Sequence, residues 1–93
     1  MKVELYRTIL CPRCLHASHA LRGVAASLPG VEIETIEVIT NPGRAREAAI
    51  RTVPAIRAGG VTLTGLILTP ARIRAFLEEQ LRRQNQAGEN APS

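Results

Sequence analysis

Two cysteines stand three positions apart in the segment Cys11-Pro12-Arg13-Cys14, and the chain has no others. They fall between a short apolar strand pattern and a long helical pattern, so we expect them at the start of a helix. The first N–H groups of a helix have no partner within it, and the helix dipole favours a nearby negative charge. A thiol is readily ionised there, and the thiolate is the form that attacks disulfides and binds metals. The pair therefore predicts a redox or metal-binding site.

The composition indicates one small folded domain with an aliphatic core. Of the 93 residues, 45% are hydrophobic, and the only aromatic ones are Tyr6 and Phe76. The net charge is +4, from eleven Arg and one Lys against eight Glu and no Asp. The arginines are spread over every segment, and almost no aromatic side chain is available to stack on bases. We therefore interpret the charge as a solvated basic surface and not as a nucleic-acid interface.

The start of the chain indicates neither export nor membrane insertion. Met1 and Lys2 lead directly into an alternating strand pattern, without the apolar run of a secretory signal. No segment has the roughly 18 continuous apolar residues that a membrane span requires. Two cysteines also cannot form a disulfide scaffold, which makes a chemical role for the pair the better interpretation. We expect a cytoplasmic monomer that binds neither membranes nor nucleic acids.

Apolar periodicity predicts seven elements in the order β-α-β-α-β-β-α. The first two strands are joined by a helix, so they should be parallel with a right-handed crossover. Asn41-Pro42 and Thr69-Pro70 each place a capping residue before a proline, a pattern typical of helix starts. Gly59-Gly60 marks a tight turn between two antiparallel strands. The predicted strands cover residues 3–7, 31–38, 54–57 and 61–64, and the predicted helices cover 12–28, 42–50 and 70–83.

These elements predict an α/β domain over residues 1–83. Its four-stranded mixed sheet should carry one helix on one face and the other two on the opposite face. Residues 84–93 have no apolar periodicity, and we expect them to form a disordered C-terminal tail.

A second motif resembles one found in thioredoxins and glutaredoxins. In those families a cis-proline begins the third strand and faces a Cys-x-x-Cys pair, and the segment Ile50–Ile56 matches this pattern. Pro54 follows Cys14 by 40 positions, a separation that is also similar to that of the family. The segment Gly65–Ile73 resembles the strand end that leads into the last helix of those proteins. The resemblance spans roughly residues 3–83 and implies a thioredoxin-like fold with a cis Val53–Pro54 bond.

The resemblance implies a thiol-disulfide oxidoreductase that acts as a reductant, and the residues agree with the roles in that family. Cys11 lies just before the first helical turn, where its sulfur can be exposed, so it would be the attacking thiolate. Cys14 lies on the core face of the helix and would be the resolving thiol. Arg13 adds a permanent positive charge that favours the thiolate.

The resemblance also implies which residues contact substrate, and it suggests the partners. Substrate contacts are expected from Pro12 and Arg13 and from the segment Thr52-Val53-Pro54, in which Val53 offers its backbone to an extended substrate strand. The expected partners are protein disulfides and an upstream thiol reductase or glutathione. We expect no cofactor and no bound metal.

Two positions depart from typical thioredoxins. Leu10 takes the place of the tryptophan before the first cysteine, and Leu5 that of a buried aspartate on the first strand. Glutaredoxins carry Gly-Gly followed by Asp before the last helix, where this chain has only Gly65. The sequence therefore belongs cleanly to neither branch.

Two other function classes remain as alternatives. The thiols suit Cu(I) or Zn(II), which would make the chain a soft-metal binding module, although its final helix does not match the β-α-β-β-α-β order of that fold. His16 and His19 extend the cysteine pair, but consecutive turns of one helix do not direct four ligands to one point, so we expect both on the surface. The other alternative is a non-catalytic thioredoxin-fold adaptor that docks on a partner enzyme.

Overall fold

The structure, a computed structural model, describes residues 1–9, 11–65 and 68–90. The expectations for Leu10, for Leu66 and Ile67 and for the last three residues of the chain lie outside the described residues. The elements follow the predicted order β-α-β-α-β-β-α. Their bounds are β1 Lys2–Arg7, α1 Pro12–Ala25, β2 Glu32–Glu37, α2 Pro42–Glu47, β3 Ala55–Ala58, β4 Val61–Thr64 and α3 Pro70–Asn90.

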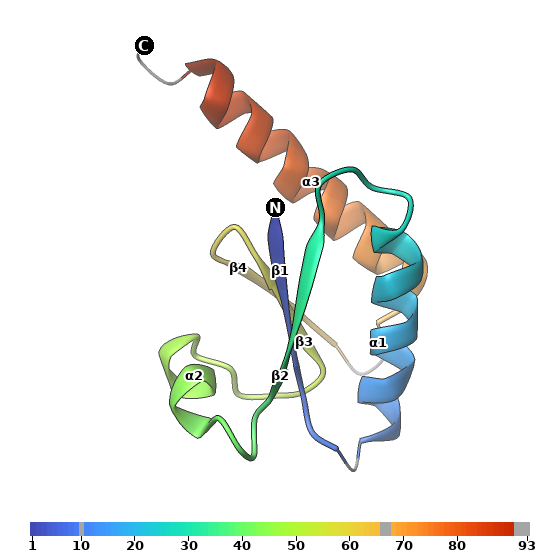
Figure 1. Ribbon diagram of the computed structural model, residues 1–93, viewed down its shortest axis with the longest axis vertical. Helices are drawn as coiled ribbons and strands as arrows, with labels where there is room; N and C mark the ends of the chain where they lie inside the picture. The colour runs from blue at the N-terminus through green and yellow to red at the C-terminus, as the bar shows by residue number, and fades with distance from the viewer. Residues whose placement is uncertain (10, 66–67, 91–93) are drawn as a thin grey trace.

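The four strands form one mixed sheet in the order β2-β1-β3-β4 (Figure 1). β1 and β2 pair in parallel, as expected for strands joined by a helical crossover, whereas β3 is antiparallel to both β1 and β4. Gly59 and Gly60 make the turn between β3 and β4, with φ angles of 59° and 79° that glycine adopts without steric cost. The predicted hairpin and four-stranded mixed sheet are therefore confirmed.

Helices cover both faces of the sheet and complete three layers. α1 and α3 lie on one face and α2 on the other (Figure 1), as predicted. Alternation along β1 separates two cores, because Val3 and Leu5 face α1 and α3 while Tyr6 faces α2. The larger core is aliphatic and contains Val3, Leu5, Ala17, Leu21, Val24, Ile56, Ala58, Leu68, Ile73 and Leu77.

The helices end at positions that differ from the predicted ones. α1 ends at Ala25, and α2 ends at Glu47, two residues before Ala49 adopts a φ of 57° that does not continue a helix. α3 runs to Asn90, although we expected it to end near Arg83 with a disordered tail after it. The prediction followed apolar periodicity, whereas Gln84, Gln86 and Ala87 have helix propensities that allow the backbone to continue as a helix without it. Among the described helices, none is long and apolar enough to cross a membrane.

Ion pairs attach α2 to the sheet. Arg44 donates to both carboxylate oxygens of Glu34 at 2.7 and 3.0 Å and to Glu4 at 2.9 Å. Lys2 pairs with Glu34 at 2.9 Å, and Arg57 pairs with Glu4 at 3.3 Å. The hydrogen bonds from Arg44, with help from Lys2, lower the pKa of Glu34 to about 2. This network holds α2 in place just before the chain reaches the segment Thr52–Pro54.

Candidate active site

Cys11 occupies the N-cap of α1, immediately before the proline at the first helical position. Its backbone is extended, with φ −110° and ψ 106°, and its Sγ accepts the backbone N–H of Cys14 at 3.1 Å. The sulfur thus satisfies one of the N–H groups that have no partner within the helix, as a serine or aspartate side chain does at other helix starts. A negative charge on Sγ strengthens this hydrogen bond, so the position favours the thiolate.

Cys14 lies one turn further along α1 and is fully buried. Ala17, Ser18 and Leu21 follow it on the same face of the helix and are buried too, because residues three and four apart share a face. Cys11, by contrast, is partly exposed, and both cysteines are free thiols. The site therefore combines one accessible sulfur with one that is shielded, as expected from the sequence.

These surroundings give the two thiols different acidities. Desolvation raises the pKa of Cys11, but the hydrogen bonds from the Cys14 thiol and backbone N–H, together with the charge of Arg13, outweigh it and lower the pKa below its ordinary value. Burial raises the pKa of Cys14 to about 11, and its hydrogen bond to Cys11 acts in the same direction. The first proton therefore leaves from Cys11, and Cys14 keeps its own proton at neutral pH.

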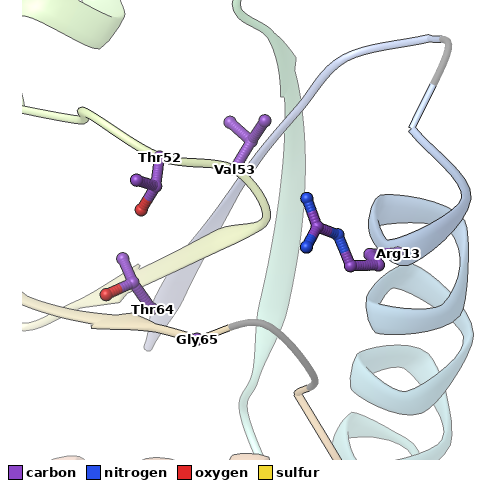
Figure 2. A pocket seen from close by; sticks show the side chains of 5 residues that line it. All are labelled: Arg13, Thr52, Val53, Thr64 and Gly65. Atoms are coloured by element: carbon purple, nitrogen blue, oxygen red, sulfur yellow. The ribbon is translucent and has the colours of Figure 1, made fainter.

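A groove of about 400 Å³ adjoins the first turn of α1. Figure 2 shows the Arg13 guanidinium directed from α1 toward the loop that carries Thr52 and Val53. The Val53–Pro54 bond is cis, as predicted, and Pro54 is buried. Val53 takes no part in the sheet, because β3 begins only at Ala55. The groove thus joins three segments that are distant in the chain, and its lining residues are Arg13, Thr52, Val53, Thr64 and Gly65.

Thr64 and Gly65 also line the site, although neither was predicted from the sequence to do so. A signal for them was present in the hairpin, since a two-residue turn sets the register of its two strands. Counting outward from Gly59-Gly60 pairs Thr64 with Ala55, as the structure shows. The end of β4 therefore lies next to the start of β3 and lines the same groove.

A second groove, of about 270 Å³ and mostly apolar, borders Cys11 itself. Its other lining residues are Arg7, Ile9, Pro12 and Leu15. Ile9 and Leu15 are 72% and 51% exposed, which is high for large aliphatic side chains. Positions 13 and 15 differ by about 200° around a helix, so Arg13 and Leu15 lie on nearly opposite sides of α1. The helix start therefore separates the groove that Arg13 lines from a groove whose walls, apart from Arg7, are mostly apolar.

The histidines next to the cysteine pair do not join it. His16 and His19 are both exposed on α1, which confirms the expectation that they are surface residues. In the part of the chain that the structure describes, no three His, Cys, Asp or Glu side chains come together as they would to hold a metal ion.

Comparisons with known proteins agree with this geometry. Over 61 residues the chain is 39% identical to the thioredoxin of Methanocaldococcus jannaschii, a match that covers 64% of this chain and 72% of that protein. Among solved structures, thioredoxin 1 from Thermosipho africanus TCF52B and desulfothioredoxin from Desulfovibrio vulgaris Hildenborough both match with a TM-score of 0.71, at 21% and 22% identity. The two matches cover 91% and 84% of this chain, and they cover 99% and 79% of the respective solved chains. No protein-family model matches the chain.

Proposed function

Because the chain belongs to the thioredoxin family and is a thiol-disulfide oxidoreductase, we propose that it reduces protein disulfides through Cys11 and Cys14. The contrast between the two sulfurs carries the assignment of their roles. Cys11 Sγ is partly exposed and accepts an N–H at the helix start, whereas Cys14 is buried and has a raised pKa. Cys11 is therefore the attacking thiolate and Cys14 the resolving thiol.

The proposed reaction consists of two exchange steps. The Cys11 thiolate attacks one sulfur of the substrate disulfide and forms a mixed disulfide, while the other substrate sulfur leaves as a thiolate and takes a proton. Cys14 then loses its proton, attacks the Cys11 sulfur and releases the second substrate thiol. The substrate gains two electrons and two protons, and the protein forms the Cys11–Cys14 disulfide. One of the protons comes from Cys14 and the other from solvent.

The proton of Cys14 has no acidic side chain at the position that typical thioredoxins use. Leu5 takes that position and is 1% exposed within the apolar core. An aliphatic side chain accepts no proton, so the departing substrate thiolate or water takes the proton from Cys14. We expect the second exchange step to be slow as a result.

We also assign the substrate contacts to Pro12, Arg13 and the segment Thr52–Pro54. Pro12 lines the groove next to Cys11, and Arg13, Thr52 and Val53 line the other groove. The backbone of Val53 would pair with an extended substrate segment, in the manner of a strand added to a sheet. An upstream thiol reductase or glutathione would then return the protein to its dithiol form. The proposed reducing direction suits a reducing compartment such as the cytoplasm, and membership of the family supports it, since the potential of thioredoxin is about −270 mV.

Reduction of insulin with dithiothreitol as the recycling reductant tests the activity. The protein should accelerate the precipitation of the insulin chains, and Cys11→Ser should lower the rate to that of dithiothreitol alone because the nucleophile is missing. His19→Ser changes an exposed residue on the same helix and should keep the activity. Full activity of Cys11→Ser would contradict the proposal, as would an inactive protein that instead binds Cu(I) or Zn(II) stoichiometrically.

Trapping tests the order of the two cysteines. Cys14→Ser should leave substrate proteins joined to Cys11, because no thiol remains to displace them. Mass spectrometry after non-reducing electrophoresis of a cell extract should recover these adducts, and dithiothreitol should release them. The double variant Cys11→Ser/Cys14→Ser is the control and should trap nothing. Adducts formed by Cys11→Ser but not by Cys14→Ser would reverse the assigned roles.

A further inference from the structure

We propose that the groove beside Arg13 selects polypeptide disulfides in which an acidic residue flanks the reactive cysteine. This inference rests on the proposed reductase function and specifies the substrate class of the same site. The groove is lined by one guanidinium, two threonine side chains, Val53 and Gly65, and none of these residues is acidic. Its chemistry therefore matches a carboxylate on the molecule that approaches Cys11.

Among the residues that the structure describes, no carboxylate pairs with Arg13. Its side chain forms no hydrogen bond or ion pair with any residue in the ranges that the structure describes. Glu4 and Glu34 are engaged by α2 on the opposite face of the sheet, and Glu79 pairs with arginines of its own helix. A guanidinium presents a planar fork of N–H donors that fits a carboxylate with two parallel hydrogen bonds. A carboxylate brought by the substrate would satisfy these donors.

A second guanidinium lies at the Gly65 end of the groove. Arg72 donates from Nη2 to the carbonyl of Thr64 at 3.5 Å. Its Nη1 lies only 2.7 Å from the point where a Cβ at position 65 would be. Glycine at this position therefore leaves the space that the Arg72 head group occupies. Thr52 and Thr64 line the same groove, with their hydroxyls on the side away from Arg13 (Figure 2).

The location of Arg13 connects the groove to the reaction. Arg13 stands between the two cysteines in the first turn of α1, and Val53 belongs to the segment that we assign to substrate pairing. Successive residues of an extended chain are about 3.3 Å apart, so the residues next to a substrate cysteine on Cys11 come within reach of Arg13. A carboxylate on one of these residues would bind in the groove, and the groove would then favour that substrate.

Matched peptide disulfides test the proposal. Three symmetrical disulfides are made from one short peptide that carries Glu, Gln or Lys on both sides of its single cysteine. The second-order rate constant for oxidation of the reduced protein is measured at pH 7 and low salt by acid quench and mass spectrometry. Each rate constant is divided by that of the same peptide with dithiothreitol, which corrects for the intrinsic reactivity of the disulfide. We expect the corrected Glu-to-Gln ratio to be about 5, and to approach 1 in 1 M salt because exposed charges are then screened.

Variants of Arg13 distinguish a preference due to the Arg13 side chain from a change in the acidity of Cys11 or in the net charge. Arg13→Gln should reduce the corrected ratio to about 1, Arg13→Lys should retain part of it, and Arg13→Glu should favour the Lys peptide. Any change in the acidity of Cys11 alters the rates of all three peptides together and leaves the ratio unchanged. Arg22→Gln removes the same charge from an exposed position near the end of α1 and should keep the ratio.

Two results would overturn the selection by Arg13. One is a Glu-to-Gln ratio that Arg13→Gln leaves unchanged, and the other is a ratio that Arg22→Gln lowers to the same extent, since net charge alone would then explain it. A Gln peptide that shows no difference from the Glu peptide but still oxidises the protein in a reaction that requires Cys11 would also overturn the selection. That result would leave the reductase function in place. Absence of any reaction that requires Cys11 would overturn both proposals.

Discussion

Cys11 and Cys14 lie one helical turn apart, yet their surroundings shift the pKa values of the two thiols in opposite directions. Cys11 Sγ accepts an N–H at the open end of the helix and stands next to the charge of Arg13. Cys14 is enclosed by the core, where burial favours its neutral form. Because the attacking sulfur must be ionised, this difference supports the proposed order, in which Cys11 reacts before Cys14.

Alkylation by iodoacetamide as a function of pH measures this difference directly. Cys11 should reach half of its maximal rate below the ordinary thiol pKa of about 8.5. Cys14 should stay unmodified until the pH approaches its raised pKa of about 11. Cys14→Ala removes the thiol donor but keeps the backbone N–H, so it should raise the pKa of Cys11. Peptide mapping distinguishes the two sites, and a Cys11 that titrates at or above the ordinary value would contradict the assignment of the nucleophile.

Ion pairs, and not buried side chains of its own, attach α2 to the sheet. It has no buried residue, and its Arg44 joins Glu34 of β2 to Glu4 of β1. The adjoining residues Ala48 and Ile50 pack against the smaller core, so the chain is anchored again just beyond the helix. The position of the Thr52–Pro54 segment therefore depends partly on an ion-pair network on the far side of the sheet from Cys11.

The variant Glu34→Gln tests how much this network contributes to stability, because that contribution should depend on pH. The hydrogen bonds from Arg44 and Lys2 lower the pKa of Glu34 to about 2 in the folded protein, below the value of about 4.3 for an unfolded chain. The lowered pKa contributes stability above pH ~4.3, and this stability is lost as the pH falls toward about 2. Glu34→Gln should therefore lower Tm by about 2–5 °C at pH 7, with a difference that narrows below pH ~4.

Glu32→Gln is the matched control for the network. Glu32 is an exposed residue of the same strand and forms no ion pair with the described residues. Its substitution should leave Tm nearly unchanged across the pH range. Circular dichroism melts of both variants supply the comparison, and an equal effect of the two substitutions would remove any special role for Glu34.

The molecule as a whole is a three-layer domain from which the C-terminal part of α3 extends beyond the sheet (Figure 1). Gln80 is the last buried side chain of this helix among the described side chains, and residues 82–85 are exposed. Among the side chains that the structure describes, the buried ones of this helix therefore end before Arg83. This agrees with a domain boundary near that residue, which remains a prediction.

Truncation tests the boundary. A chain that ends after Arg83 should unfold cooperatively in urea, with a free energy of unfolding within about 1 kcal/mol of the full chain, because no buried side chain among those described is removed. It should also keep its activity toward insulin. A chain that ends after Glu79 also loses Gln80 and should be less stable. A large loss of stability on removal of residues 84–93 would show that these residues belong to the domain.

Features that depend on neighbours along the chain could be predicted from the sequence. The cysteine pair before a helix, the proline at its first position and the two-glycine turn act over a few residues, so their patterns indicated the element order and the place of the dithiol. The cis bond before Pro54 was inferred from a family resemblance, because the local preference of such a bond is trans. Local rules also had limits: Asn41 precedes α2 as predicted, but its side chain donates to the carbonyl of Glu37 at 3.0 Å instead of capping the helix.

The grooves around the site required the folded chain. Arg13, Thr52 and Thr64 come from three different elements, and no local pattern indicates that their side chains line one groove. Packing of α1 on the sheet brings Arg13 to this place, and the register of the hairpin brings Thr64 there. In the same way, Glu34 and Arg44 meet only because a parallel strand pair and α2 converge. Such contacts form only when packing brings together residues that are distant in the chain. The reactivity of Cys11 instead depends on the helix that starts beside it, which the local sequence indicates.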